Sequence, residues 1–137
     1  MPVIYEFDVN GKLVRTRCVG NVTLEEVVGH FATLQQDPNC PNYLDVLLDL
    51  AELTSLPNQN ELRTVSQTIG KARPRVVFGS CAIVAPRDAV FGMMRMFEVF
   101  AQQHFRATHV FRAVSEAEKW LAAQEPNANQ KLKRASG

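Results

Sequence analysis

The sequence has little that would direct the protein to a polyanion, a membrane or an acidic surface. Its 15 basic and 14 acidic residues leave a net charge of +1 over 137 residues, which gives no reason to expect nucleic-acid binding. No stretch approaches the roughly 18 consecutive apolar residues of a membrane span, and charges in the N-terminal stretch exclude a secretory signal peptide. We therefore expect a cytoplasmic protein without a membrane span.

Reactive and cofactor-binding motifs are equally scarce. The three cysteines, Cys18, Cys40 and Cys81, form no CxxC pair, so we expect reduced thiols, with Cys40 in its Asn-Cys-Pro loop the most accessible. No glycine-rich phosphate loop or nucleophile elbow is present, and the three histidines fall on separate predicted elements. These absences predict no cofactor, no metal and no catalytic residues. An enzyme using Cys40 or a histidine is the last-ranked hypothesis.

What the chain does contain is enough apolar residue for one core. Hydrophobic residues make up 46% and charged residues 21%, as in ordinary globular proteins, and the length suits a single domain. We assign residues 1–125 to that domain. Residues 126–137 carry one apolar side chain larger than alanine and no periodicity, which predicts a flexible tail.

The first 18 residues predict an antiparallel hairpin. Residues 3–9 alternate in polarity, and Asn10-Gly11 supplies a two-residue turn. A type I′ turn sets the register, in which the facing pairs are Val9–Lys12, Phe7–Val14, Tyr5–Thr16 and Val3–Cys18 on one side, and Glu6–Arg15 and Ile4–Arg17 on the other. This register puts apolar residues on one face and a charge-complementary pair on the wetter face.

Strands and helices then alternate along the chain. Residues 43–50 are apolar on both faces apart from two aspartates, which predicts a central strand covered on both sides. The helix starts are marked by capping pairs, which are Thr23 with Glu26, Asn58 with Glu61, and Ser115 with Glu118. A third helix is predicted over residues 87–104. The order predicts an α/β fold, a mixed sheet of about five strands with about four helices, in which parallel β-α units follow the antiparallel hairpin.

This order resembles that of the SpoIIAA-like family of small bacterial proteins, which belongs with the STAS domains and their anti-sigma factor antagonists. The resemblance covers roughly residues 3–124 and is carried by LLDLAEL, AIVAPRDAVFGMMRMFE and THVFRAVSEAEKWL. It implies a non-enzymatic regulatory module that acts by binding a protein. STAS antagonists are phosphorylated on a serine in an Asp-Ser-Ser-Gly turn after the central strand. The equivalent stretch here, residues 51–58, lacks that motif and offers only Thr54 and Ser55 as phosphoacceptors.

The predicted third helix is apolar over a wider arc than one sheet contact needs. Three explanations fit this arc: a helix packed deep against the sheet and a neighbouring helix, a homodimer interface, or the wall of a pocket for a small apolar or lipid-like ligand. The candidate interface residues are Phe91, Met94 and Phe97. Gly92 indicates close approach of another backbone or a ligand, because glycine inside a helix costs about 1 kcal/mol relative to alanine.

The candidate ligand-binding residues are Asp49, Met93 and Arg95. Arg95 either pairs with Glu98 on the same helix or, if buried among methionines, grips the acidic head of a ligand. Asp49 ends the central strand, where open α/β sheets place their ligand crevices, or else it caps the turn that follows. The sequence thus predicts a module that binds a regulatory protein or a second copy of itself, with binding of an apolar ligand as the alternative.

Overall fold

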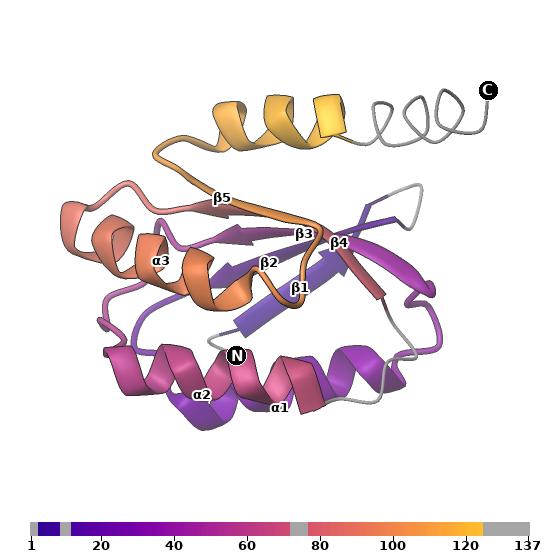
Figure 1. The fold of residues 1–137 in the computed structure, drawn as a ribbon, viewed down its shortest axis with the longest axis horizontal. Helices are drawn as coiled ribbons and strands as arrows, with labels where there is room; N and C mark the ends of the chain where they lie inside the picture. Colours follow the sequence, from indigo (N-terminus) through magenta and orange to yellow (C-terminus); the bar gives the residue numbers. More distant parts are fainter. Residues whose placement is uncertain (1–2, 9–11, 72–76, 125–137) are drawn as a thin grey trace.

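The computed structural model describes residues 3–8, 12–71 and 77–124 (Figure 1). Its elements are β1 (Val3–Phe7), β2 (Leu13–Cys18), α1 (Leu24–Gln36), β3 (Tyr43–Asp49), α2 (Gln59–Lys71), β4 (Val77–Val84), α3 (Asp88–Ala101), β5 (Ala107–Phe111) and a last helix over residues 114–124. The predicted α/β class, the mixed five-stranded sheet and the four helices are confirmed. The Asn10-Gly11 turn, the Val9–Lys12 pair and the tail over residues 126–137 lie outside the described residues.

The five strands form one sheet in the order β1-β2-β3-β4-β5. The first two strands pair antiparallel and every later neighbour pairs parallel. Within the hairpin, Phe7 faces Val14 and Val3 faces Cys18, so the register predicted from the two-residue turn is confirmed. β3 has a strand on each side, which is the central position that its two apolar faces predicted.

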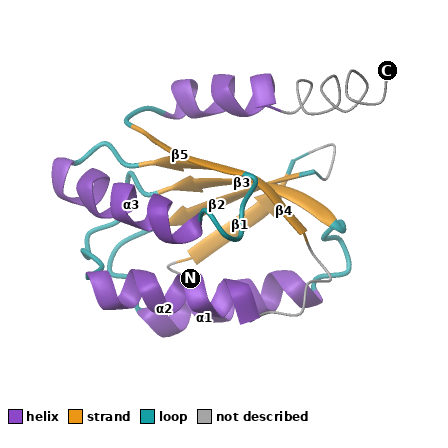
Figure 2. Cartoon of the chain, viewed as in Figure 1, coloured by secondary structure: helices purple, strands orange, loops and turns teal. Residues whose placement is uncertain are grey.

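The helices form a layer on each face of the sheet (Figure 2). Each β-α-β unit moves one strand further in the same direction, from β2 to β5, and right-handed crossovers that share a direction put their helices on the same face. α1, α2 and α3 accordingly pack together on one face, whereas the helix over residues 114–124 crosses the other (Figure 1). This arrangement encloses the larger core between the three helices and the sheet.

Each face of β3 contributes to a different apolar cluster. Leu44 and Val46 belong to the larger cluster, which lies under α1, α2 and α3, while Leu47 belongs to the smaller one. The smaller cluster is completed by Ala117 and Leu121 from the last helix. The alternation of side chains along a strand therefore accounts for the continuous apolar run in this stretch.

Side-chain caps start α1 and α2 as predicted. Thr23 Oγ1 accepts from the amide of Glu26, whose carboxylate accepts from the amide of Thr23. Asn58 and Glu61 make the same reciprocal pair before α2. The predicted cap of the last helix is wrong, because that helix starts at residue 114 and so includes Ser115. Its expected partner Glu118 instead lies 2.9 Å from Arg15 on β2.

The β3–β4 pairing is irregular around Asp45, which is buried rather than near solvent. Its Oδ1 accepts a hydrogen bond of 2.8 Å from the amide of Ser80. A Cβ at Gly79 would collide with this carboxylate and with the hydroxyl of Tyr43, so only glycine fits there. The close approach of these polar groups fixes how β4 sits beside β3.

Candidate functional site

The principal feature of the larger core is a cavity of about 600 Å³ between α1, α2, α3 and the sheet. On the sheet side, the cavity is lined by Val3, Thr16, Cys18, Val46, Leu48 and Cys81. On the helix side, it is lined by Leu24, Glu25, Val27, His30, Phe31, Leu34, Glu61, Leu62, Val65, Met94 and Phe97. Loop residues close the remainder, namely Asn21, Val22, Thr23, Leu50, Leu53, Ser55, Leu56, Pro57 and Phe105. Most of these side chains are apolar.

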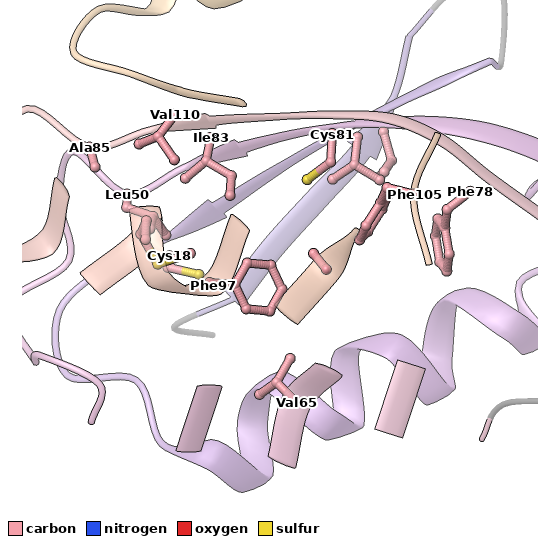
Figure 3. Packing of buried hydrophobic residues seen from close by; sticks show 14 of the residues in the cluster. Cys18, Leu50, Val65, Phe78, Cys81, Ile83, Ala85, Phe97, Phe105 and Val110 are labelled. Carbon is pink, nitrogen blue, oxygen red and sulfur yellow. The ribbon is translucent and has the colours of Figure 1, made fainter. Parts of the chain in front are cut away.

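The space arises from a mismatch in side-chain size between the two layers. On the sheet, the inward positions that line the cavity include the small residues Thr16, Cys18 and Cys81. Figure 3 labels Cys18 on the sheet, Phe97 on α3 and Val65 on α2, which all line the cavity. Short side chains at these positions occupy less of the space beneath the helices than larger ones would.

The exposed end of the cavity is formed by the loops that precede α1 and α2. Ser55 joins these loops, because its hydroxyl accepts from the amide of Val22 at 3.1 Å and lies 3.3 Å from the Val22 carbonyl. A backbone bridge between Gly20 and Leu53 supports the same junction, and the guanidinium of Arg87 donates to the Leu53 carbonyl. The mouth therefore lies beyond the carboxyl ends of β2 and β3, where open α/β sheets place their ligands.

Polar groups are few in the interior of the cavity. His30 from α1 and Thr16 from β2 approach each other there, with His30 Nε2 at 3.3 Å from Thr16 Oγ1. Burial lowers the pKa of His30 to about 4, so the imidazole is neutral near pH 7. The other polar lining residues, including Glu25 and Glu61, belong to the mouth or to the first turns of α1 and α2.

The cysteines are structural rather than reactive. Cys40 is 3% exposed, so the prediction that it is the accessible thiol is wrong; its loop turns inward and packs it against the larger core. Burial raises the pKa of the Cys18 thiol to about 11 and that of Cys81 to about 12. Thiols held neutral in this way are poor nucleophiles at neutral pH.

None of the three predicted ligand-binding residues lines the cavity. Arg95 points to solvent with its side chain 59% exposed, and its Nε lies 3.0 Å from Glu98 Oε1, as in the intrahelical alternative. Met93 packs at the margin of the larger core. Asp49 alternates with the inward-facing Leu48, and its Oδ1 accepts from the amide of Ala51, so it caps the turn after β3.

The candidate interface residues are divided between core and surface. Met94 and Phe97 are buried and line the cavity. Two residues that were predicted to form a homodimer interface therefore form part of the cavity wall on α3. Phe91 is half-buried beneath the guanidinium of Arg112, which lies 4.1 Å from its ring centroid. Within the described part of the chain no neighbouring backbone approaches Gly92, because a Cβ there would meet nothing within 4 Å.

The two candidate phosphoacceptors have different surroundings. Thr54 is exposed, and its amide donates to the carbonyl of Gly20. Ser55 is half-buried at the mouth of the cavity with its hydroxyl bonded to Val22. A phosphate on Ser55 would replace that contact, whereas one on Thr54 would extend into solvent.

Comparisons with known proteins add no functional assignment. A scan against protein-family models matches none of them, and a search of the curated proteins finds no relative. Over residues 3–8, 12–71 and 77–124, no three His, Cys, Asp or Glu side chains are grouped as metal ligands. In that same part of the chain, no helix has the length and apolar character needed to cross a bilayer.

Sequence reasoning located one wall of the cavity and missed the rest. The stripe of Val27, Phe31 and Leu34 on α1 predicted burial, but it gave no reason to single out His30 beside it. A usable signal was present on the strands, where Thr16 and Cys18 are small residues at positions predicted to lie on the apolar face of the hairpin. Short side chains opposite a helix indicate either close packing or enclosed space.

Proposed function

We propose that this protein binds a small, largely apolar molecule in the cavity beneath α1, α2 and α3. The observation that carries the proposal is the combination of size and lining: about 600 Å³, lined mainly by aliphatic and aromatic side chains, with fewer polar residues. Binding sites for small molecules have volumes of roughly 300 to 1,000 Å³ and this same composition. The volume is thus of the right order for a ligand of moderate size.

A fluorescent neutral probe tests the proposal. Nile red should bind saturably with one site per chain, and Val65→Phe, which places a ring in the cavity, should weaken its binding at least tenfold. Val65 is 8% exposed and lines the cavity from α2. The matched control is Val99→Phe, the same substitution at a site 61% exposed on α3 that does not line the cavity, and this variant should bind as the parent does.

Far-UV and near-UV circular dichroism establish that each variant is folded. If Val65→Phe does not fold, Val27→Phe narrows the same space from α1. Failure of the parent protein to bind the probe, or equal binding by a folded cavity-filled variant and Val99→Phe, would rule out the cavity as the binding site.

A regulatory interaction module of the SpoIIAA-like, STAS-related type is the second candidate, and it is favoured by the outer face of α3. Val99 is a large apolar side chain with 61% of its surface exposed there, about two turns along the helix from the open position of Gly92. Such a face suits a homodimer or a cytoplasmic protein partner. Sedimentation velocity at tens of micromolar should detect a dimer that Val99→Glu dissociates. A parent protein that is monomeric under these conditions removes the homodimer.

A further inference from the structure

Two carboxylates stand at the mouth of the cavity. Glu25, in the first turn of α1, and Glu61, in the first turn of α2, both belong to its lining. Glu25 is exposed and Glu61 is half-buried, so both side chains are accessible to a ligand that reaches the mouth. Among the described residues, no basic side chain forms an ion pair with either of them. The one hydrogen bond that Glu61 accepts comes from the uncharged amide of Asn58. Negative charge at the mouth is therefore left uncompensated.

The positive charge near the mouth is smaller than the negative charge. Within the described ranges no lysine or arginine lines the cavity, and the imidazole of His30 is neutral because burial lowers its pKa to about 4. The guanidinium of Arg87 donates to the Leu53 carbonyl at this junction, but Arg87 is not part of the lining. The starts of α1 and α2 each contribute roughly half a unit of positive charge, which together is less than the charge of two carboxylates. The mouth is thus acidic, whereas the interior is apolar.

We infer that the ligand of this cavity is an amphiphile with an apolar body and one cationic group, such as a protonated amine, whose charge is held at the mouth by Glu25 and Glu61. This inference rests on the proposed function and specifies its ligand. The apolar body contacts lining residues such as Val65 and Phe97, while the ammonium group stays at the mouth in contact with water. This orientation avoids burying the charge, which costs far more than burying a hydrocarbon chain. A carboxylate or phosphate group at the same place would lie beside two like charges.

Three ten-carbon probes with different head groups test the charge preference. At pH 7.5 decylamine is a cation, decanol is neutral and decanoate is an anion, and their affinities are measured by displacement of Nile red at concentrations below micelle formation. The parent protein should bind decylamine more tightly than decanoate. Because an exposed ion pair changes affinity by roughly 1.5- to 5-fold, Glu25→Gln or Glu61→Gln should weaken decylamine by about that factor and leave decanol unchanged. The same substitutions should tighten the binding of decanoate.

A matched control separates the position of the charge from its loss. Glu116→Gln removes one exposed carboxylate from the last helix, which packs on the other face of the sheet and does not line the cavity, so this variant should bind all three probes as the parent does. The substitution at Glu61 preserves the start of α2, because a glutamine side chain also accepts the hydrogen bond from the Asn58 amide.

The outcomes distinguish this inference from the function on which it rests. If Nile red does not bind the parent protein, the proposed function fails. If Nile red binds but decylamine does not displace it, or decanoate displaces it as well as decylamine does, the cavity is a ligand site and the inferred cation is wrong. The inference also fails if the substitutions at Glu25 and Glu61 weaken decylamine no more than they weaken decanol, or no more than Glu116→Gln does.

Discussion

Replacing His30 with phenylalanine should remove a large part of the acid sensitivity of the fold. The pKa of His30 is about 4 in the folded protein because of burial, against 6.5 in an unfolded chain. As the pH falls below 6.5, the unfolded chain takes up the proton first, so the free energy of unfolding declines until the pH reaches the folded pKa. Between pH 7 and pH 5 this group alone accounts for about 2 kcal/mol of lost stability.

Urea unfolding at both pH values, followed by circular dichroism, measures this loss in the parent protein and in His30→Phe. Several other titratable groups lie near His30. Tyr5 packs against its ring and donates a hydrogen bond to Asp37, Glu25 and Glu61 lie at the mouth of the cavity, and Cys18 and Cys81 lie on the sheet. Burial, followed by the hydrogen bond to Asp37, raises the pKa of Tyr5 to about 12, and those of the two thiols are also raised, so none of these three titrates in acid. The carboxylates are common to both proteins and cancel in the difference. Equal loss of stability in the two proteins would refute the assignment of a buried, neutral His30.

Three further substitutions test local features of the fold by urea unfolding. Gly92→Ala should stabilise the protein by about 0.5–1 kcal/mol, since a Cβ there meets open space within a helix; destabilisation would reveal a neighbour at that face. Gly79→Ala should cost more than about 1 kcal/mol because its Cβ would collide with the buried carboxylate of Asp45, and a neutral result would mean that β3 and β4 shift easily. Arg95→Ala should change stability by less than about 0.5 kcal/mol and leave Nile red affinity unaltered, because the Arg95 side chain is 59% exposed and does not line the cavity; a large loss of affinity would restore Arg95 as a ligand contact.

The fold could be predicted from the sequence because its main signals are local. The hairpin register follows from a two-residue turn and a period of two, and the capping boxes at Thr23 and Asn58 need only four residues each. The third helix was predicted longer than it is, over residues 87–104, because His104 falls on the same helical face as Val90 and Met93, whereas α3 ends at Ala101 and a turn follows. The start of the last helix was misplaced because Glu118 was expected to form a cap with Ser115. In the structure, Glu118 forms an ion pair with Arg15 on β2 instead.

The candidate site could be predicted only in part, because its volume depends on how separate elements pack. The breadth of the apolar arc on α3 suggested a pocket wall as one alternative, and Met94 and Phe97, which were predicted as interface residues, line the cavity. The polar interior could not be read from spacing, since Thr16 and His30 lie on a strand and a helix whose relative placement sets their distance. Arg95 was a plausible anchor in sequence, but the helical period turns it outward.

The most direct test of the apolar cavity is a crystal structure of the protein soaked with bromonaphthalene, in which anomalous scattering locates the bromine atom without ambiguity. We expect a strong peak beneath α3, between Cys18, Val65 and Phe97 (Figure 3). A bromine peak confined to the outer surface, or no peak in crystals that diffract well, would contradict the claim that the space between the helices and the sheet is a ligand site.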